Sequence, residues 1–225
     1  MNTFTPKMNT ISAAQMHLWP LLKNTKSLGF VLYGGTAVAL QLGHRESVDF
    51  DFFAHHPLDQ KQIINAIPFL QSATTLQDEK DTWVVLVQTK ESTPIKLSFF
   101  GSIQFGRAAK PLLTNDQILY VASLDDLMAT KLKVILQRAE KKDYLDILAM
   151  LQSGQSLERG LATGKLFFRN TFQPGESLKA LTYFDDGDLS ALSQKDKDIL
   201  IKSVERVSAL PEVSLESLNL SEGIE

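Results

Sequence analysis

Short apolar runs and alternating apolar and polar positions dominate the first half of the chain and predict β-strands. In one of these segments Val85 points to one face and Val84 to the other, which predicts a strand buried on both sides. The expected strands cover residues 30–33, 47–53, 73–77, 82–89, 95–100 and 118–122, with a chain-reversing turn over residues 90–94 and an irregular segment over residues 101–117.

Helical spacing of apolar residues occurs near the N-terminus and throughout the second half. Asn9 or Thr10 is expected to cap a first helix that ends near Pro20, because proline lacks an amide donor. Ser123, with Asp126 three residues later, has the spacing of a capping box, so these acids are expected to cap a helix and not to catalyse. Further helices are predicted over residues 58–67, 123–136, 141–151, 157–166, 178–184 and 195–207, followed by a loosely packed tail over residues 208–225.

A glycine pair stands in the most informative stretch of the chain, residues 31–53. Gly34 and Gly35 follow a buried strand, and a short helix starting at Thr36 is expected to end at Gly43. Small residues let phosphate oxygens approach backbone amides, and the N-terminus of a helix favours an anion. Gly34, Gly35 and Thr36 are therefore candidates for binding the phosphates of a nucleoside triphosphate.

Two aspartates stand in the strand that follows this helix. Because side chains alternate along a strand, Asp49 and Asp51 share one face, and Val48, Phe50 and Phe52 are expected to face the core. Neighbouring carboxylates repel each other, so a cation is expected beside them. Mg²⁺ binds through one or two carboxylates together with substrate phosphates, which makes these aspartates candidate metal ligands. The alternative is a solvent-facing edge strand after an ordinary tight turn.

Composition limits the class of protein further. With 225 residues, of which 44% are hydrophobic, the chain can bury a substantial core, and the absence of cysteine excludes disulfides, thiolate metal sites and a cysteine nucleophile. A formal net charge of −3 gives no global basic field, so a nucleic-acid partner would need a local patch. No stretch reaches the ~18 apolar residues of a membrane span, so a cytoplasmic protein without a membrane partner is expected.

The motifs stand in the order found in a known group of enzymes. Through GGTA at residues 34–37, GHR at residues 43–45 and SVDFDF at residues 47–52, the chain resembles the AbiEii/AbiGii-type toxin family of the nucleotidyltransferase superfamily that includes DNA polymerase beta. Their ordered combination is more specific than a glycine pair or an Asp-x-Asp alone. The resemblance implies an α+β fold with a polymerase-beta-like core and a mixed sheet over residues 1–122, a helical C-terminal region over residues 123–207 and a tail over residues 208–225.

A second group of charged residues resembles the later motif of the same family. Lys131, Arg138 and the Asp-x-x-Asp pair Asp143 and Asp146 stand in its order. The resemblance implies that Lys131, Arg138 and both acids of the Asp-x-x-Asp pair face the nucleotide pocket. It also implies that Lys131 contacts the triphosphate and that Asp143 orients Lys131 or the nucleotide. Lys142 keeps the charge, but not the bidentate contacts, of the arginine that many members have there. The alternative is a surface helix with salt bridges.

The chain departs from the superfamily on the strand over residues 95–100. Related transferases often place a third carboxylate there, which completes a metal site and can accept the proton of the attacking hydroxyl. Ser98 stands at the equivalent position, and its hydroxyl is a neutral ligand and a poor base. Either another acid reaches the site, or one metal ion with the substrate phosphates suffices, or the enzyme is impaired.

The resemblance implies a Mg²⁺-dependent enzyme that transfers a nucleotide from a nucleoside triphosphate to an acceptor hydroxyl. Its catalytic residues would be Asp49, Asp51, Lys131 and Asp143. The resemblance also implies the toxin of a toxin–antitoxin pair with a cognate antitoxin, and some relatives modify tRNA ends, which makes tRNA a candidate acceptor.

Two other functions remain open from the sequence. Ser98 and the lack of a basic surface favour a degenerate relative that binds a nucleotide or a protein without transfer. Imidazoles beside the two strand aspartates favour a zinc site or a metal hydrolase that uses His44, His55 and His56. Against the zinc site, the spacing fits no recognised zinc motif, and Pro57 places the adjacent histidines in a turn.

Overall fold

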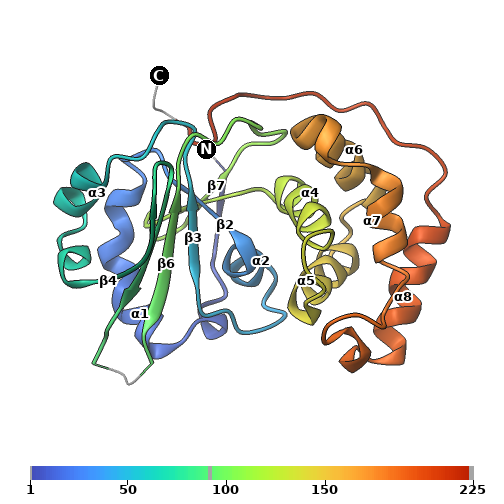
Figure 1. Ribbon diagram of the computed structural model, residues 1–225, viewed down its shortest axis with the longest axis horizontal. Coiled ribbons are helices and arrows are strands. Elements are labelled where there is room, and N and C mark those ends of the chain that lie inside the picture. Colours follow the sequence, from blue (N-terminus) through green and yellow to red (C-terminus); the bar gives the residue numbers. More distant parts are fainter. Residues whose placement is uncertain (1, 91–92, 223–225) are drawn as a thin grey trace.

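The computed structural model describes residues 2–90 and 93–222, and Figure 1 shows a mixed sheet beside a group of helices. Glu91 and Ser92 of the predicted turn, and the last three residues of the tail, lie outside the described residues. Within them the sheet has eight strands, in the order β1 (Thr3–Phe4), β7 (Leu112–Thr114), β8 (Tyr120–Val121), β2 (Val31–Tyr33), β3 (Phe50–Phe53), β6 (Ile95–Phe100), β5 (Thr82–Val87) and β4 (Thr74–Glu79).

Helices cover both faces of the sheet. In Figure 1, α1 (Ala13–Leu18) and α3 (Gln60–Ala66) lie on one side and α2 (Gly34–Leu42) on the other. Beyond α2 follow α4 (Leu124–Val134), α5 (Lys141–Gln152), α6 (Leu157–Phe168), α7 (Pro174–Ala180) and α8 (Gln194–Glu205). Short 3₁₀ segments occupy Met8–Thr10, Trp19–Thr25, Pro68–Ser72, Arg169–Thr171 and Leu189–Ala191.

Strand β3 lies at the centre of the sheet, antiparallel to β2 and parallel to β6, with Asp51 aligned to Ser98. Phe50 and Phe52 are fully buried, as the alternation predicted. The ring of Phe50 lies 6.4 Å from that of Trp19, on the side of the sheet covered by α1. The prediction is wrong for Val48, which is 55% exposed because β3 begins only at Phe50.

The ends of several predicted elements differ from the structure. The cap of α1 is Ser12 and not Asn9 or Thr10: Ser12 Oγ accepts the Gln15 amide at 3.2 Å, and the Gln15 side chain accepts the Ser12 amide at 2.9 Å. The Thr10 hydroxyl instead donates to the Lys7 carbonyl at 2.7 Å. Strands β1 and β7 were not predicted, and β7 lies in the segment predicted to be irregular. Helix α7 begins at Pro174 and not at residue 178.

Strand β5 is buried on one face and not on both, which corrects the sequence-based expectation. Trp83 and Val85 are 3% and 0% exposed, whereas Val84 and Leu86 are only partly buried. The face that carries Val84 contributes to the floor of a cleft between the sheet and α4 instead of packing beneath α1 and α3.

The end of the tail is anchored, contrary to the prediction of loose packing. Arg107, which is 8% exposed, donates from Nη1 to the carbonyls of Leu220 at 3.2 Å and Ser221 at 2.6 Å. A backbone bridge joins Arg107 to Ser217, and Leu220 is 1% exposed. Figure 1 shows the tail running from α8 back to the sheet. The tail therefore connects the last helix to the segment that contains Arg107.

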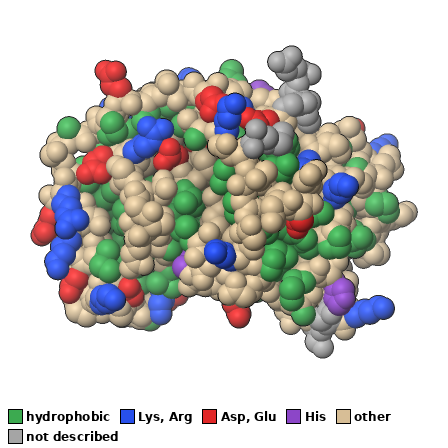
Figure 2. Space-filling view, turned by 180° about the vertical axis from the view of Figure 1, so that it is seen from behind, with side chains coloured by type: hydrophobic (Ala, Val, Ile, Leu, Met, Phe, Trp, Pro, Cys, Tyr) green, Lys and Arg blue, Asp and Glu red, His purple; other side chains and the backbone are tan. Residues whose placement is uncertain are grey.

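Basic and acidic side chains are interspersed on the face shown in Figure 2, in keeping with the small net charge. None of the helices in the described ranges combines the length and the apolar character that crossing a bilayer requires.

At the start of α4, the backbone of Asp126 takes part in the predicted helix cap and its side chain does not. Ser123 Oγ accepts the Asp126 amide at 3.1 Å, as expected of a helix cap. The Asp126 carboxylate instead accepts the amide of Ala108 at 3.1 Å and is 1% exposed. Burial raises the pKa of Asp126 to about 7.

Arg107→Ala is expected to lower the free energy of unfolding by roughly 2–4 kcal/mol, because two carbonyls lose a charged donor. Limited proteolysis should then cut within the released tail, and denaturant unfolding measures the loss. Lys110→Ala is the control, since its ion pairs to Glu216 and Glu222 are longer, at 4.0 and 3.4 Å, and its side chain is 58% exposed. Equal protease resistance of the Arg107 variant and the parent would contradict the anchoring role.

Asp126→Asn is expected to gain stability relative to the parent as the pH rises from 5 to 8. A carboxyl whose pKa is higher in the folded state stabilises the fold below its unfolded pKa of about 4, and this contribution is lost as the pH rises toward about 7. The asparagine removes the charge that is unfavourable at pH 8, an effect of at most a few kcal/mol. Thermal unfolding across this range measures it. The exposed Asp185→Asn variant is the control, and its stability relative to the parent should stay constant from pH 5 to 8. The same constancy in the Asp126→Asn variant would contradict a raised pKa of Asp126.

Candidate active site

A cleft of about 500 Å³ lies between the sheet and α4. Its floor is one face of β3, β6 and β5, and its walls are α4 and, across from it, the start of α2 with the loop before β3. Two predicted site residues lie behind its surface: Thr36 is 2% and Asp143 0% exposed. The other predicted site residues line it: Gly34, Gly35, Asp49, Asp51, Lys131 and Arg138.

The floor of the cleft carries the two aspartates of the Asp-x-Asp motif. Burial raises the pKa of Asp51, a hydrogen bond from Ser98 and the charge of Lys96 lower it, and the charge of Asp49 raises it again. Lys96 Nζ lies 3.0 Å from Asp49 Oδ2, and these side chains are 39% and 34% exposed. The two carboxylates are therefore close enough for their like charges to oppose each other.

The glycine pair packs against charged side chains from two sides. Gly34 has a φ of 73°, in the left-handed region that favours glycine. A Cβ at Gly34 would collide with the Asp51 carboxylate, and one at Gly35 would collide with the Arg45 guanidinium. Helix α2 begins at Gly34 and not at Thr36 as predicted. The glycine pair therefore supplies amides of the first turn, which have no partner inside the helix.

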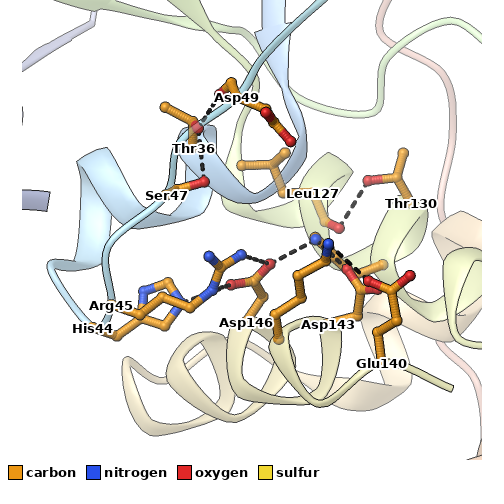
Figure 3. A network of polar contacts seen from close by, with 12 residues as sticks. Thr36, His44, Arg45, Ser47, Asp49, Leu127, Thr130, Glu140, Asp143 and Asp146 are labelled. Carbon is orange, nitrogen blue, oxygen red and sulfur yellow. Dashed lines mark hydrogen bonds and ion pairs between the residues drawn. The ribbon is translucent and has the colours of Figure 1, made fainter. Parts of the chain in front are cut away.

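Thr36 fixes the aspartate segment and does not face the cleft. Its hydroxyl hydrogen-bonds to the Asp49 carbonyl and, at 2.8 Å, to the Ser47 hydroxyl. Figure 3 shows these three residues together at the start of α2. The Thr36 hydroxyl is therefore not available to a phosphate, because it bonds to Asp49 and Ser47. Only the backbone amide of Thr36 stays a candidate for the predicted phosphate contact.

Two aspartates of α5 hold the cations on the opposite wall. Lys131 Nζ lies 2.6 Å from both Asp143 Oδ1 and Asp146 Oδ2, and its side chain is 6% exposed. Arg138, which is 46% exposed, donates from Nε to Asp143 Oδ2 at 2.8 Å. Burial alone would raise the pKa of Asp143, but the hydrogen bond from Arg138 and the charge of Lys131 bring it below its usual value. Asp143 therefore contacts both Lys131 and Arg138, and the role implied for it in orienting Lys131 stays a prediction.

The loop before β3 adds a histidine and an arginine to this network, as Figure 3 shows. His44 Nε2 lies 2.7 Å from Asp146 Oδ1, and Arg45 donates to both oxygens of Asp146, at 2.6 and 2.9 Å. Burial would raise the pKa of Asp146, but His44, Lys131 and Arg45 together lower it. Asp146, which the resemblance placed facing the nucleotide pocket, is 0% exposed and lies behind the cleft surface. Its pairing with Arg45 could not be predicted, because a contact across 101 residues leaves no local pattern.

The three histidines that suggested a transition-metal site lie apart. His55 Nδ1 is 2.9 Å from the Ile103 carbonyl, His56 Nε2 is 2.7 Å from the Leu28 carbonyl, and His44 contacts α5. Within residues 2–90 and 93–222, no three His, Cys, Asp or Glu side chains form a group suited to a metal ion. This geometry contradicts both the zinc site and the histidine-based hydrolase.

The donors on the cleft floor fit a hard divalent cation such as Mg²⁺. Asp49 and Asp51 offer carboxylate oxygens in one cleft, and a cation would relieve the repulsion between them. Mg²⁺ completes its coordination with water and substrate phosphates, so two protein carboxylates suffice when a nucleotide is bound. The glycine turn lies beside the Asp51 carboxylate, so phosphates bound at its amides would lie near the same carboxylates.

The fold has a match among solved structures. The structure of MenT4, nucleotidyltransferase toxin Rv2826c from Mycobacterium tuberculosis H37Rv, matches with a TM-score of 0.60 at 17% sequence identity, over 87% of this chain and 83% of that chain. The chain shares the fold of that structure, and the predicted α+β architecture with a mixed sheet is thereby confirmed.

Sequence comparison identifies the family. The model of the family described as "Nucleotidyl transferase AbiEii toxin, Type IV TA system" matches residues 20–214, and the chain belongs to this family of nucleotidyltransferase toxins. A protein of Aquifex aeolicus (strain VF5), described as "Uncharacterized protein aq_aa25", is 34% identical over 172 residues, 73% of this chain and 80% of the relative. The resemblance drawn from the motifs is confirmed, whereas the domain boundary after residue 122 stays a prediction.

Gly34→Ala is expected to lower both stability and nucleotide transfer. The left-handed backbone costs a side chain about 1–2 kcal/mol, and the new Cβ must displace the Asp51 carboxylate. Gly175→Ala in α7 is the matched control, since a Cβ there meets nothing within 4 Å and no loss is expected. Denaturant unfolding and a label-transfer assay measure the two effects. A Gly34 variant as stable and active as the Gly175 variant would show that the turn tolerates a side chain.

Proposed function

We propose that this protein transfers a nucleotide from a nucleoside triphosphate to an acceptor hydroxyl, with Mg²⁺ held by Asp49 and Asp51. One observation carries the proposal: a single cleft contains these two carboxylates, the glycine turn at the start of α2, and the cations Lys131 and Arg138. Carboxylates for a metal ion, amides for phosphates and fixed positive charges are the parts that nucleotidyl transfer requires.

Each part has a role that follows from its position. Bound Mg²⁺ would neutralise charge on the substrate phosphates. The amides of Gly34 and Gly35 would bind phosphate oxygens at the start of α2. Lys131 uses two of its three N–H donors on Asp143 and Asp146, and the third would offset charge that develops on the leaving pyrophosphate.

The transfer step needs little covalent chemistry from the protein. The acceptor oxygen forms a bond to the α-phosphorus, and the bond from this phosphorus to the oxygen bridging to the β-phosphate breaks. Pyrophosphate leaves with the electron pair, and the hydroxyl proton passes to water in the open cleft. Ser98 does not accept this proton, but a loose transition state depends mainly on positioning and on charge neutralisation.

The proposed partners follow from the family and the cleft. The family belongs to a toxin–antitoxin system, so we propose a cognate antitoxin as the protein partner. We propose tRNA as the first acceptor to test, because the exposed ammonium groups of Lys96 and Lys142 add cations along the cleft where a polyanion would enter.

One observation favours a second function, nucleotide binding without transfer. Ser98 pairs with Asp51 in the position expected of a third carboxylate, and Lys96 contacts Asp49. In this second function the cleft would still bind a triphosphate and would lack the groups for efficient transfer.

Asp49→Asn and Asp51→Asn are each expected to reduce transfer at least about 100-fold, because each removes a negative charge that holds the metal ion. The assay follows label from each of the four nucleoside triphosphates onto tRNA, and calorimetry with Mg²⁺ measures nucleotide binding separately. Asp185→Asn, a change at an exposed loop position, should transfer like the parent. Full activity in either cleft variant would refute the metal-ligand roles, and binding without transfer in the parent would support the second function.

A further inference from the structure

Strand β6 brings a lysine and a serine to Asp51 of β3 and to Asp49, the residue before this strand. In the parallel register Ser98 stands beside Asp51, to which its hydroxyl hydrogen-bonds, and Ser98 is 3% exposed. Two residues earlier, Lys96 places its ammonium 3.0 Å from the Asp49 carboxylate. Each aspartate therefore has a partner on β6, and neither partner is an acid.

The charges of these four residues fit one metal ion better than two. Two-metal sites clamp the attacking and leaving oxygens with a pair of divalent cations, and three carboxylates with two such cations leave one positive charge. Asp49, Asp51, Lys96 and one divalent cation also leave one positive charge. A second divalent cation here would lack a third carboxylate and would lie near the Lys96 ammonium, which repels it.

We propose that Lys96 takes the place of the second metal ion: the cleft holds one divalent cation, and the Lys96 ammonium contacts the phosphate that is transferred. The inference rests on the proposed function, since it requires Asp49 and Asp51 to hold the cation. It assigns Lys96 as a catalytic residue, which the family motifs did not indicate.

The exposure of Lys96 allows this change of partner. Its pair with Asp49 is more than one-third exposed on the lysine side, and such pairs are weak and exchange readily. When a cation binds Asp49, it repels the ammonium, and the flexible four-carbon stem lets Nζ turn to a phosphate oxygen. Lys131 lacks this freedom, because it is 6% exposed and held by two aspartates.

Lys96→Met gives effects of opposite sign on two measurements. Without nucleotide, the variant should bind Mn²⁺ about three- to tenfold more tightly than the parent, because the competing ammonium on Asp49 is gone. With substrate, its kcat should fall at least about tenfold, because the transferred phosphate loses a positive charge. Loss of a merely structural contact would weaken both, and removal of a simple competitor would improve both.

Electron paramagnetic resonance of free Mn²⁺ measures the affinity and the number of bound ions. With a non-hydrolysable triphosphate analogue, the parent should bind one Mn²⁺ per chain. Lys96→Arg keeps the charge and should retain transfer within a few-fold of the parent. Lys61→Met is the matched control, since this exposed lysine is on α3, across the sheet from the cleft.

Two results would overturn the role of Lys96 alone: two Mn²⁺ ions bound per chain in the parent, or a Lys96→Met variant that transfers as fast as an active parent. A parent whose Mn²⁺ binding is unaffected by Asp51→Asn and that transfers no label would instead overturn the proposed function, and this inference with it.

Discussion

The cleft depends on two buried carboxylates, Asp143 and Asp146, both 0% exposed. Between them they hold Lys131 from α4, Arg138 from the segment after it and Arg45 from the loop before β3. Breaking a buried ion pair leaves an uncompensated charge, at a cost of about 3–5 kcal/mol. The helices and the sheet are therefore joined by ion pairs as well as by a shared hydrophobic core. These ion pairs hold α4 and the loop before β3 to the same two residues of α5 and so limit the width of the cleft.

This network of ion pairs also determines the charge that a nucleotide or a metal ion meets in the cleft. Asp143 and Asp146 offset much of the positive charge that Lys131, Arg138 and Arg45 bring to one wall, while Asp49 and Asp51 keep the floor acidic. A triphosphate entering such a cleft meets like charge on the floor unless a cation lies there. Nucleotide and metal ion would therefore bind cooperatively, which is how Mg²⁺ is commonly held, by one or two carboxylates together with phosphates.

Local patterns in the sequence predicted part of the local structure. Alternation placed Phe50 and Phe52 in the core and Asp51 in the cleft, because a strand has a fixed two-residue period, and Asp49 lines the cleft from the residue before the strand. The pairing of Arg45 with Asp146 and the anchoring of the tail by Arg107 depend on residues more than 100 positions apart. Such contacts are chosen by the packed fold, and no periodicity or capping motif encodes them.

The glycine turn also has a packing role, because charged side chains of the cleft lie directly against it. Gly34 leaves room for the Asp51 carboxylate, Gly35 leaves room for Arg45, and Thr36 holds the backbone of Asp49. Three consecutive residues thus position both acids of the floor and one cation of the wall. A side chain at either glycine would push the floor and the wall apart, whatever ligand the cleft contains. The ordered motif is therefore specific because its parts touch, and the proposed phosphate binding would use a turn that packing already requires.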